Sequence, residues 1–229
     1  MTTPSYVARR GELEAYFDRT AVEAWKRLTS DAPVGRIRAT VRAGRDEMRR
    51  LLMSYLPADI KGARILDAGC GTGAMAQALA ERGADVVAVD LSPQLVAVAR
   101  DRTPGHLLPL IRYEAGDMMS PELGRFDFCI AMDSLIHYER PDMLACLARL
   151  ADRTEHALAF TFAPSTAMLT AMHRLGKLFP RDNRSPAIVP VKAGALATLL
   201  RRKTGMTPQR SQRVSSGFYI SQAQELVRT

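Results

Sequence analysis

The chain has 229 residues, of which 47% are hydrophobic, so it is long enough to bury the core of one α/β domain with an N-terminal extension. Its formal net charge of +8 comes largely from arginine, which suits an anionic membrane, a nucleic acid or a carboxylate-bearing substrate. Aromatic residues make up only 6% and the arginine spacing matches no nucleic-acid module, so we do not expect nucleic acid as a partner.

The cysteine content argues against a metal centre. Cys70, Cys129 and Cys146 are widely spaced and match neither a zinc site nor a disulfide framework. We therefore expect no protein-bound metal and a reducing compartment. The N-terminus has no apolar signal core, and no apolar run reaches membrane-spanning length. The sequence thus predicts a soluble, cytoplasmic protein, which leaves peripheral contact with a membrane open.

The first sixty residues are predicted to be helical and to lie outside any sheet. Apolar residues recur at mostly helical spacing over 12–28, with an interruption near Asp18, and again over 36–56, where Pro57 ends the pattern. We expect residues 1–60, here called the N-terminal cover, to close the mouth of a site or to pack on a sheet edge.

From residue 61 onward the pattern alternates between strand and helix. Strands are predicted at 64–67, 86–89, 110–114, 126–132 and 157–163, with a final antiparallel pair from 206–213, 217–221 and 225–227. Helices are predicted at 72–82, from Ser92-Pro93 onward, and at 141–150, 166–178 and 192–203. This alternation predicts a Rossmann-like α/β domain over 61–229, with a seven-stranded, mostly parallel sheet and helices on both faces. Segment 164–190 is expected near the substrate mouth, with 180–190 a lid candidate.

The first strand runs into a glycine turn, read as D-A-G-C-G-T-G over residues 67–73. A strand, a glycine turn and a helix are how a nucleotide-like ligand is held, because Gly69, Gly71 and Gly73 let the backbone bend and let a ligand approach it. The looser dinucleotide fingerprint is also satisfied, so a nicotinamide or flavin site is an alternative. Asp67 favours S-adenosylmethionine, which carries an ammonium and a sulfonium and no phosphate for the carboxylate to repel.

Three further acids follow the other predicted strands. Asp90 ends the second strand and is expected to accept hydrogen bonds from both ribose hydroxyls. Asp117 follows the third strand, where it can accept from the adenine amine, and Asp133 ends the fourth. Ligands bind at the carboxyl ends of parallel strands, so four acids at four strand ends indicate one adenosine site. The remaining residues assigned to this cofactor site are Arg42, Cys70, Leu91 and Met118.

The D-x-G-x-G-x-G pattern resembles motif I of the class I S-adenosylmethionine-dependent methyltransferases. That resemblance implies that the segment after the fourth strand, residues 133–138, meets the methyl acceptor. His137 titrates near neutral pH, so it can donate to an acceptor carboxylate or neutralise it. The alternative is a histidine that only caps the following helix.

Together these residues resemble the magnesium protoporphyrin IX O-methyltransferases of chlorophyll and bacteriochlorophyll synthesis, which are class I S-adenosylmethionine-dependent methyltransferases. The similarity covers residues 12–228, and its specific segments are 16–20 with 25–27, the arginine-glycine helix start at 42–44, L-I-H-Y at 135–138, F-A-P at 162–164, L-F-P at 178–180 and F-Y-I-S at 218–221. Thr29 stands where the family often has tyrosine, so a phenolic role there is not carried over. Tyr16 and Tyr138 are the alternative catalytic candidates, beside His137.

The resemblance implies methyl transfer to one propionate of magnesium protoporphyrin IX, which gives the monomethyl ester and S-adenosylhomocysteine. It also implies transient contact with the porphyrin-binding subunit of magnesium chelatase and a place at the periphery of the photosynthetic membrane. Two rival functions stay open. One is a methyltransferase acting on another small acceptor, such as a quinone precursor, and the other is a nicotinamide-binding reductase or a nucleotide sensor.

Overall fold

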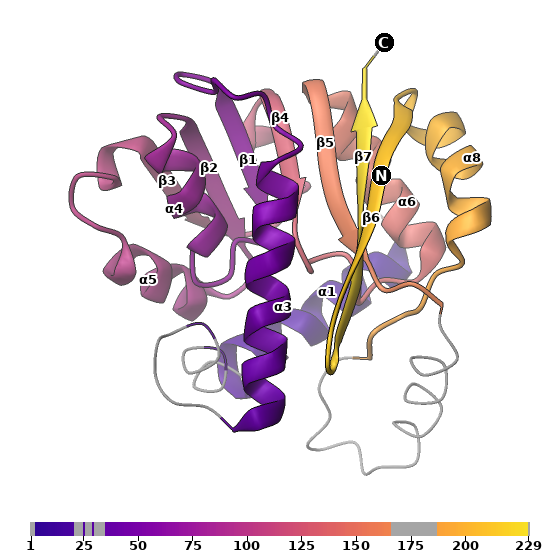
Figure 1. Cartoon of the computed structure of the whole chain (residues 1–229), viewed down its shortest axis with the longest axis horizontal. Coiled ribbons are helices and arrows are strands. Elements are labelled where there is room, and N and C mark those ends of the chain that lie inside the picture. Colours follow the sequence, from indigo (N-terminus) through magenta and orange to yellow (C-terminus); the bar gives the residue numbers. More distant parts are fainter. Residues whose placement is uncertain (1–2, 21–24, 26–28, 30–34, 166–186, 229) are drawn as a thin grey trace.

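The computed structural model describes residues 3–20, 25, 29, 35–165 and 187–228 (Figure 1). The helix predicted at 166–178 and most of the loop predicted at 180–190 lie outside the described residues, as does the L-F-P segment at 178–180.

A single seven-stranded sheet has the order β3-β2-β1-β4-β5-β7-β6. Its strands are β1 (Arg64–Ala68), β2 (Asp85–Asp90), β3 (Ile111–Ala115), β4 (Phe126–Ala131), β5 (Thr154–Phe162), β6 (Thr207–Ser216) and β7 (Tyr219–Val227). The first five strands are parallel, and β7 runs antiparallel to both β5 and β6. The predicted fold class is therefore confirmed.

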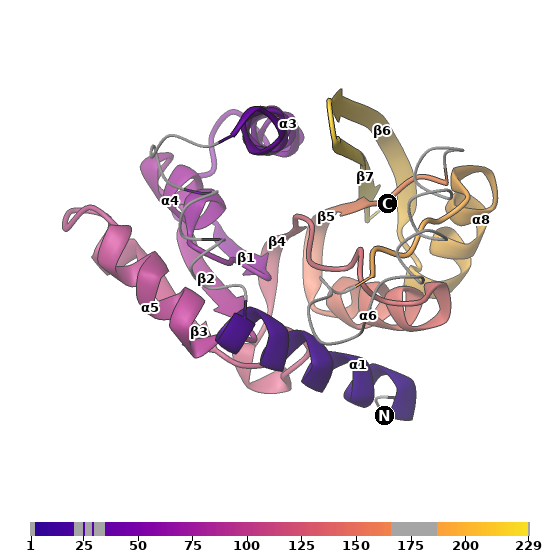
Figure 2. The same cartoon turned by 90° about the horizontal axis from the view of Figure 1, so that it is seen from below.

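Helices cover both faces of this sheet (Figures 1 and 2). Helices α3 (Arg36–Met53), α4 (Ala74–Glu81) and α5 (Pro93–Arg102) pack on one face, and α1 (Pro4–Ala15), α6 (Arg140–Asp152) and α8 (Ala193–Thr204) pack on the other. Successive strand residues point to opposite faces, so Leu66 of β1 enters the core under α6 while Ile65 enters the core under α3. Short turns of 3-10 helix lie at Leu108–Leu110 and Pro121–Leu123.

The first helix begins well before its predicted start at residue 12. Thr3 caps it, because its Oγ1 accepts a hydrogen bond from the Tyr6 amide at 3.1 Å, and Pro4 occupies the first turn. After α1, the described chain continues as a π-helical turn over Tyr16–Thr20. Tyr6 and Leu13 are buried in the same core as Leu66, so α1 packs with the sheet. The division at residue 60 stays a prediction.

Two further expectations need correction. The family-like segment 42–44 is not a helix start, because α3 begins at Arg36 and Gly44 lies in its middle, against the ring of Tyr219. The break predicted between 221 and 225 is also wrong, since β7 is continuous. Gln222 and Gln224 look like turn residues in sequence, but their side-chain amides donate hydrogen bonds to Ser211 and Arg210 of β6.

Candidate functional site

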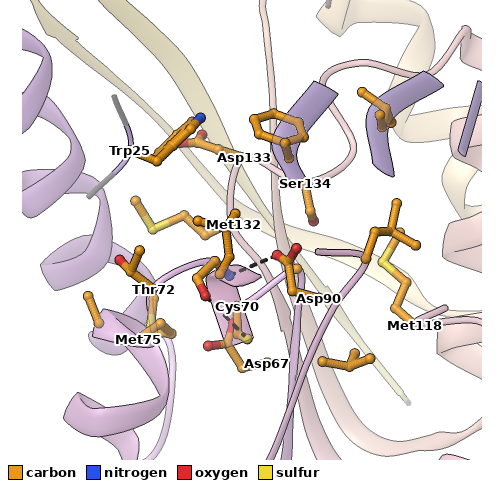
Figure 3. A pocket seen from close by; sticks show the side chains of 18 of the residues that line it. Trp25, Asp67, Cys70, Thr72, Met75, Asp90, Met118, Met132, Asp133 and Ser134 are labelled. Carbon is orange, nitrogen blue, oxygen red and sulfur yellow. Dashed lines mark hydrogen bonds between the residues drawn. The ribbon is translucent and has the colours of Figure 1, made fainter. Parts of the chain in front are cut away.

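The carboxyl ends of β1, β2, β3 and β4 surround a pocket of about 310 Å³ (Figure 3). That volume is at the low end of the range for small-molecule sites, roughly 300–1,000 Å³. The glycine turn and the four strand ends line it on one side, and the N-terminal cover lines it on the other. The cover contributes Tyr6, Leu13, Phe17, Trp25, Thr29, Arg42, Arg45, Asp46 and Arg49.

The glycine turn is shaped for a ligand lying against its backbone. Gly69, Gly71 and Gly73 have φ values of 86°, 53° and 84°, a left-handed region that favours glycine. Gly69 and Gly71 line the pocket, and a Cβ on Gly71 would meet only open space. Gly73 is not among the described pocket-lining residues. A Cβ there would lie 2.7 Å from the Tyr113 hydroxyl and 2.9 Å from Ala99, so close packing explains this third glycine.

Asp67 is a buried carboxylate with an unused oxygen. It is 1% exposed, and its Oδ2 has no hydrogen-bond partner in the described part of the chain. Burial, reinforced by the nearby charge of Asp90, raises the pKa of Asp67 to about 7. A buried acceptor of this kind calls for a cationic or hydrogen-bond-donating partner inside the pocket.

Asp90 organises the turn as well as lining the pocket. Its Oδ2 accepts a hydrogen bond from the Gly71 amide at 2.8 Å, and its Oδ1 accepts from the Ser92 amide at 3.0 Å. Burial raises its pKa, against the effect of these backbone donors. Each carboxylate oxygen has a second lone pair, so both can still accept from a ligand.

The two remaining strand-end acids are engaged by the N-terminal cover. Asp117 accepts hydrogen bonds from the Tyr6 hydroxyl at 2.7 Å and the Met119 amide at 2.9 Å, and its other oxygen pairs with Arg10 at 2.9 Å. The adenine contact expected of Asp117 would therefore be made beside α1.

Asp133 is more heavily bonded than Asp117. Its carboxylate accepts from Arg45 at 2.7 Å, from the Tyr219 hydroxyl at 3.1 Å and from the Thr161 hydroxyl at 3.0 Å. These bonds join α3, β5 and β7 at the end of β4. A direct cofactor contact by Asp133 stays a prediction that its present partners do not favour.

The three catalytic candidates occupy different positions. His137 lines the pocket; its Nδ1 lies 3.4 Å from the Ala187 carbonyl oxygen and its ring 5.8 Å from the Phe17 ring. Tyr138 also lines the pocket, but it is 2% exposed and stacked on Tyr6 at 5.1 Å. Tyr16 is not among the described lining residues, and its ring packs edge-on against Phe17.

The remaining predicted cofactor residues, Arg42, Cys70, Leu91 and Met118, all line the pocket. Cys70 is buried, and burial raises the pKa of its thiol well above the ordinary value. It therefore stays a neutral thiol at physiological pH. All three cysteines are free and buried.

Among the residues of the pocket wall that sequence patterns missed are Tyr6, Arg45 and Ser134. Thr3-Pro4 is a helix start that would have placed Tyr6 on a helix, but nothing local shows that this helix reaches Asp117. Arg45 lies between the Asp133 carboxylate and the Trp25 ring, whose centroid is 4.8 Å from its guanidinium carbon. Ser134 follows a recognised acid without any motif of its own.

Two negative findings concern the described residues alone. Within them, no group of three or more histidine, cysteine, aspartate or glutamate side chains is arranged to hold a metal ion. Among the same residues, none of the helices is both long and apolar enough to cross a membrane.

Comparison with known proteins gives a consistent result. The family model described as the magnesium-protoporphyrin IX methyltransferase C-terminus matches residues 131–228, and a general methyltransferase-domain model matches residues 65–156. The magnesium-protoporphyrin O-methyltransferase of Rhodobacter capsulatus is 50% identical over 221 residues, which cover 96% of this chain and 97% of that protein. The protein of the same name from Synechocystis is 29% identical, with 93% and 94% covered.

A solved structure agrees with these relatives. The crystal structure of magnesium protoporphyrin IX methyltransferase (ChlM) from Synechocystis PCC 6803 with bound SAH superposes with a TM-score of 0.84 at 28% identity, covering 96% of this chain and all of that one. Both the fold and the nearly complete match to the Rhodobacter protein lead to one conclusion: the chain belongs to the magnesium-protoporphyrin O-methyltransferase family.

Proposed function

We propose that this chain is an S-adenosyl-L-methionine:magnesium-protoporphyrin O-methyltransferase. It transfers the methyl group to the carboxylate of one propionate of magnesium protoporphyrin IX, giving the monomethyl ester and S-adenosylhomocysteine in chlorophyll or bacteriochlorophyll biosynthesis. The observation that carries this proposal is the identity to the Rhodobacter capsulatus enzyme along nearly the whole chain. Neither rival acceptor chemistry nor nicotinamide chemistry has support of that extent.

The pocket residues fit an adenosine ligand with a cationic end. The unused oxygen of Asp67 suits an ammonium, and the open side of Gly71 leaves room for a ligand against the backbone. In this assignment Asp90 accepts from the ribose hydroxyls and Asp117 from the adenine amine, and Leu91 and Met118 border the base. Arg42, which also lines the pocket, is assigned to the cofactor carboxylate.

When bound, the cofactor supplies an electrophilic methyl group. The propionate that accepts it is already ionised at pH 7, so the protein needs no strong base. The protein's contribution is to align the carboxylate oxygen with the methyl group and to exclude water. His137 is assigned to orient this carboxylate from the pocket wall. The buried Tyr138, stacked on Tyr6, is assigned to support that wall, and Tyr16 has the weakest case because it is not a described lining residue.

The porphyrin must lie largely at the mouth of the pocket, because a cavity of about 310 Å³ has no room for a macrocycle beside the cofactor. Arg42, Arg45 and Arg49 recur every three or four residues and so share the pocket face of α3. Arg45 is bonded to Asp133, and Arg49 pairs with the half-exposed Asp46. An exposed pair of that kind is weak and is readily exchanged for a substrate carboxylate. We assign Arg49 to the second propionate.

Two contacts outside the pocket belong to the same proposal: a transient one with the porphyrin-binding subunit of magnesium chelatase, and a peripheral one with the photosynthetic membrane. Both would spare an apolar porphyrin free diffusion through water. Ile37 and Phe218 support an apolar contact, because they are 58% and 53% exposed. They lie near each other, since Gly217 packs against Thr40 of α3.

The test is a methyl-transfer assay with three acceptors side by side: magnesium protoporphyrin IX, metal-free protoporphyrin IX and a quinol precursor. We expect the magnesium porphyrin to be turned over far faster than the other two. Preference for the quinol would replace the porphyrin with the rival acceptor. Calorimetry with S-adenosylhomocysteine and with NADH separates the remaining rival, since binding of NADH alone would indicate a nicotinamide site.

A further inference from the structure

The buried hydroxyl of Ser134 has no hydrogen-bond partner in the described part of the chain, and the proposed function does not supply one. In the described part of the chain, four buried side-chain polar atoms lack a hydrogen-bond partner, and two of them belong to residues of the pocket, Asp67 Oδ2 and Ser134 Oγ. Leaving a buried polar atom unsatisfied costs roughly 1–3 kcal/mol, so such atoms mark places where a partner is to be expected. The other two atoms lie outside the pocket.

The residues that carry the two unsatisfied pocket oxygens are both close to Gly69, one in sequence and the other in space. Asp67 precedes Gly69 by two residues, and Ser134 lies directly against it, because a Cβ on Gly69 would be 2.3 Å from the Ser134 Cβ and 3.1 Å from its Oγ. In Figure 3 the Ser134 hydroxyl is directed towards the floor of the pocket, where the glycine turn and Asp90 lie. Because Gly69 has no side chain, the glycine turn after β1 can approach the segment that follows β4 at this place.

The backbone before Ser134 is held in an unusual conformation. Asp133 is the one non-glycine residue of the described chain with positive φ, at 55°. Such a conformation costs roughly 1–3 kcal/mol and persists only where the surroundings determine it. Here Arg45, Tyr219 and Thr161 all bond to the Asp133 carboxylate. Three other elements of the fold thus hold the backbone that positions Ser134 at the pocket.

We propose that the Ser134 hydroxyl binds the ammonium group of the cofactor together with Asp67. An ammonium has three N–H donors and no acceptor, so it requires several acceptors around one point. Asp67 Oδ2 supplies one acceptor and Ser134 Oγ a second, which a change of side-chain rotamer turns further into the pocket. The cofactor carboxylate is a poor partner here because Asp67 would repel it. The inference rests on the proposed function only for the identity of the cofactor.

The experiment compares two ligands on two variants by calorimetry. The ligands are S-adenosylhomocysteine and S-adenosyl-4-thiobutyrate, which has the same nucleoside, sulfur and carboxylate but no amino group. Ser134→Ala is expected to weaken S-adenosylhomocysteine binding by roughly 10- to 150-fold, as for loss of one hydrogen bond to a charged group. The deaminated ligand should bind both proteins equally. Ser211→Ala, which removes a partnered hydroxyl on β6 outside the pocket, is the control and should change neither affinity.

Three results would overturn the assignment. Equal weakening of both ligands would mean that Ser134 contacts the carboxylate or only supports the turn. Unchanged affinities would mean that its hydroxyl is not used, and gain of affinity would mean that it hinders binding. Ser134→Cys keeps the side-chain shape with a weaker acceptor, so it repeats the test if the alanine variant folds poorly. Failure of the wild-type protein to bind S-adenosylhomocysteine would instead count against the proposed function.

Discussion

Four aspartates lie at or just after the carboxyl ends of their strands, yet each has a different set of partners. Asp90 holds the glycine turn, Asp117 holds α1, and Asp133 joins α3 to β7. Asp67 alone keeps a buried oxygen without a partner in the described chain. The position of an acid at a strand end therefore indicates a ligand site, but its remaining hydrogen-bond capacity decides what it can bind.

Asp67 should make cofactor binding depend on pH. In the ligand-free fold its pKa is about 7, above the ordinary value of an aspartate. The protonated carboxyl therefore stabilises the fold in full below about pH 4, and this contribution to the free energy of unfolding is lost as the pH rises through 7. A bound ammonium favours the charged carboxylate, so binding at pH 6 must release a proton. We expect S-adenosylhomocysteine affinity to rise roughly five- to tenfold from pH 6.0 to 7.5. Calorimetry in buffers of different ionisation enthalpy measures both the affinity and the released proton.

Asp67→Asn is the matched control for this pH dependence. The amide cannot ionise, so the variant should bind S-adenosylhomocysteine weakly and with little change between the two pH values. A steep pH dependence that survives in Asp67→Asn would assign the titration to another group, of which Asp90 is the nearest candidate because burial also raises its pKa.

His137 should orient the acceptor carboxylate without acting as an obligatory base. The propionate has no proton to remove at working pH, so His137→Ala should lower turnover roughly 10- to 1000-fold, as for loss of one aligning donor. His137→Gln keeps a donor of similar reach and should recover part of the loss. Both variants should bind S-adenosylhomocysteine normally. Full activity in the alanine variant would show the histidine to be structural, and complete loss in both would indicate proton transfer.

Sequence reasoning found the residues of the site that lie within local patterns. Asp67, Asp90 and the glycine turn are recognisable because strand, turn and helix follow one another in the chain. Tyr6, Arg45 and Ser134 were missed because their place depends on tertiary contacts between distant segments, such as the 2.7 Å bond from Tyr6 to Asp117. Assigning them from sequence would require knowing how α1 and α3 pack at the strand ends.

At the level of helices and strands, the sequence predicted the type of element better than its extent. The parallel strands were found because each is a short apolar run, and α5 because Ser92 and Pro93 are a recognisable start. The start of α1 was missed because its exposed face is polar and only Tyr6 and Leu13 are buried. The middle of β7, residues 222–224, was missed because Gln222 and Gln224 obtain their partners from the neighbouring strand.

Two glycines inside helices offer a matched test of packing. Gly44 of α3 has no room for a side chain, because a Cβ would lie 2.5 Å from the Tyr219 ring, whereas a Cβ on Gly11 of α1 would meet nothing within 4 Å. Gly44→Ala should therefore lower the free energy of unfolding by about 1–3 kcal/mol, the usual cost of overpacking. Gly11→Ala should raise it by up to about 1 kcal/mol through helix propensity. Denaturant unfolding measures both changes.

The pair of variants Gly44→Ala and Gly11→Ala also tests whether packing against β7 holds α3 in place. If Gly44→Ala leaves the free energy of unfolding unchanged, α3 can move away from β7 at little cost. Because Arg45 lies on the same helix, such a movement would break its bond to Asp133. The same variant should weaken S-adenosylhomocysteine binding, because the pocket wall includes Arg42 and Arg45 of this helix. Gly11→Ala should leave that affinity unaltered.

Across the protein as a unit, three of the contacts that tie the N-terminal cover to the rest of the domain lie around the pocket. Tyr6 and Arg10 bond to Asp117, and Arg45 bonds to Asp133. Asp18 accepts hydrogen bonds from the Ser92 hydroxyl at 3.0 Å and the Gln94 amide at 3.2 Å, at the start of α5. Two of the three anchors are acids assigned to the cofactor site by sequence. If the cofactor contacts Asp117, as proposed, that carboxylate is shared with the cover, and binding should be coupled to the order of the cover.

Hydrogen exchange of the α1 amides tests this coupling. If the cover must open to admit the cofactor, bound ligand suppresses opening by the factor 1 + [L]/Kd, so ligand at 100 times Kd should slow exchange up to roughly 100-fold. Arg10→Gln removes a half-exposed ion pair worth up to about 1 kcal/mol, so ligand-free α1 should exchange roughly two- to fivefold faster. Amides of α8, outside the pocket, are the internal control. Unchanged α1 exchange with ligand would show that the cover is a fixed wall and that the cofactor enters without moving α1.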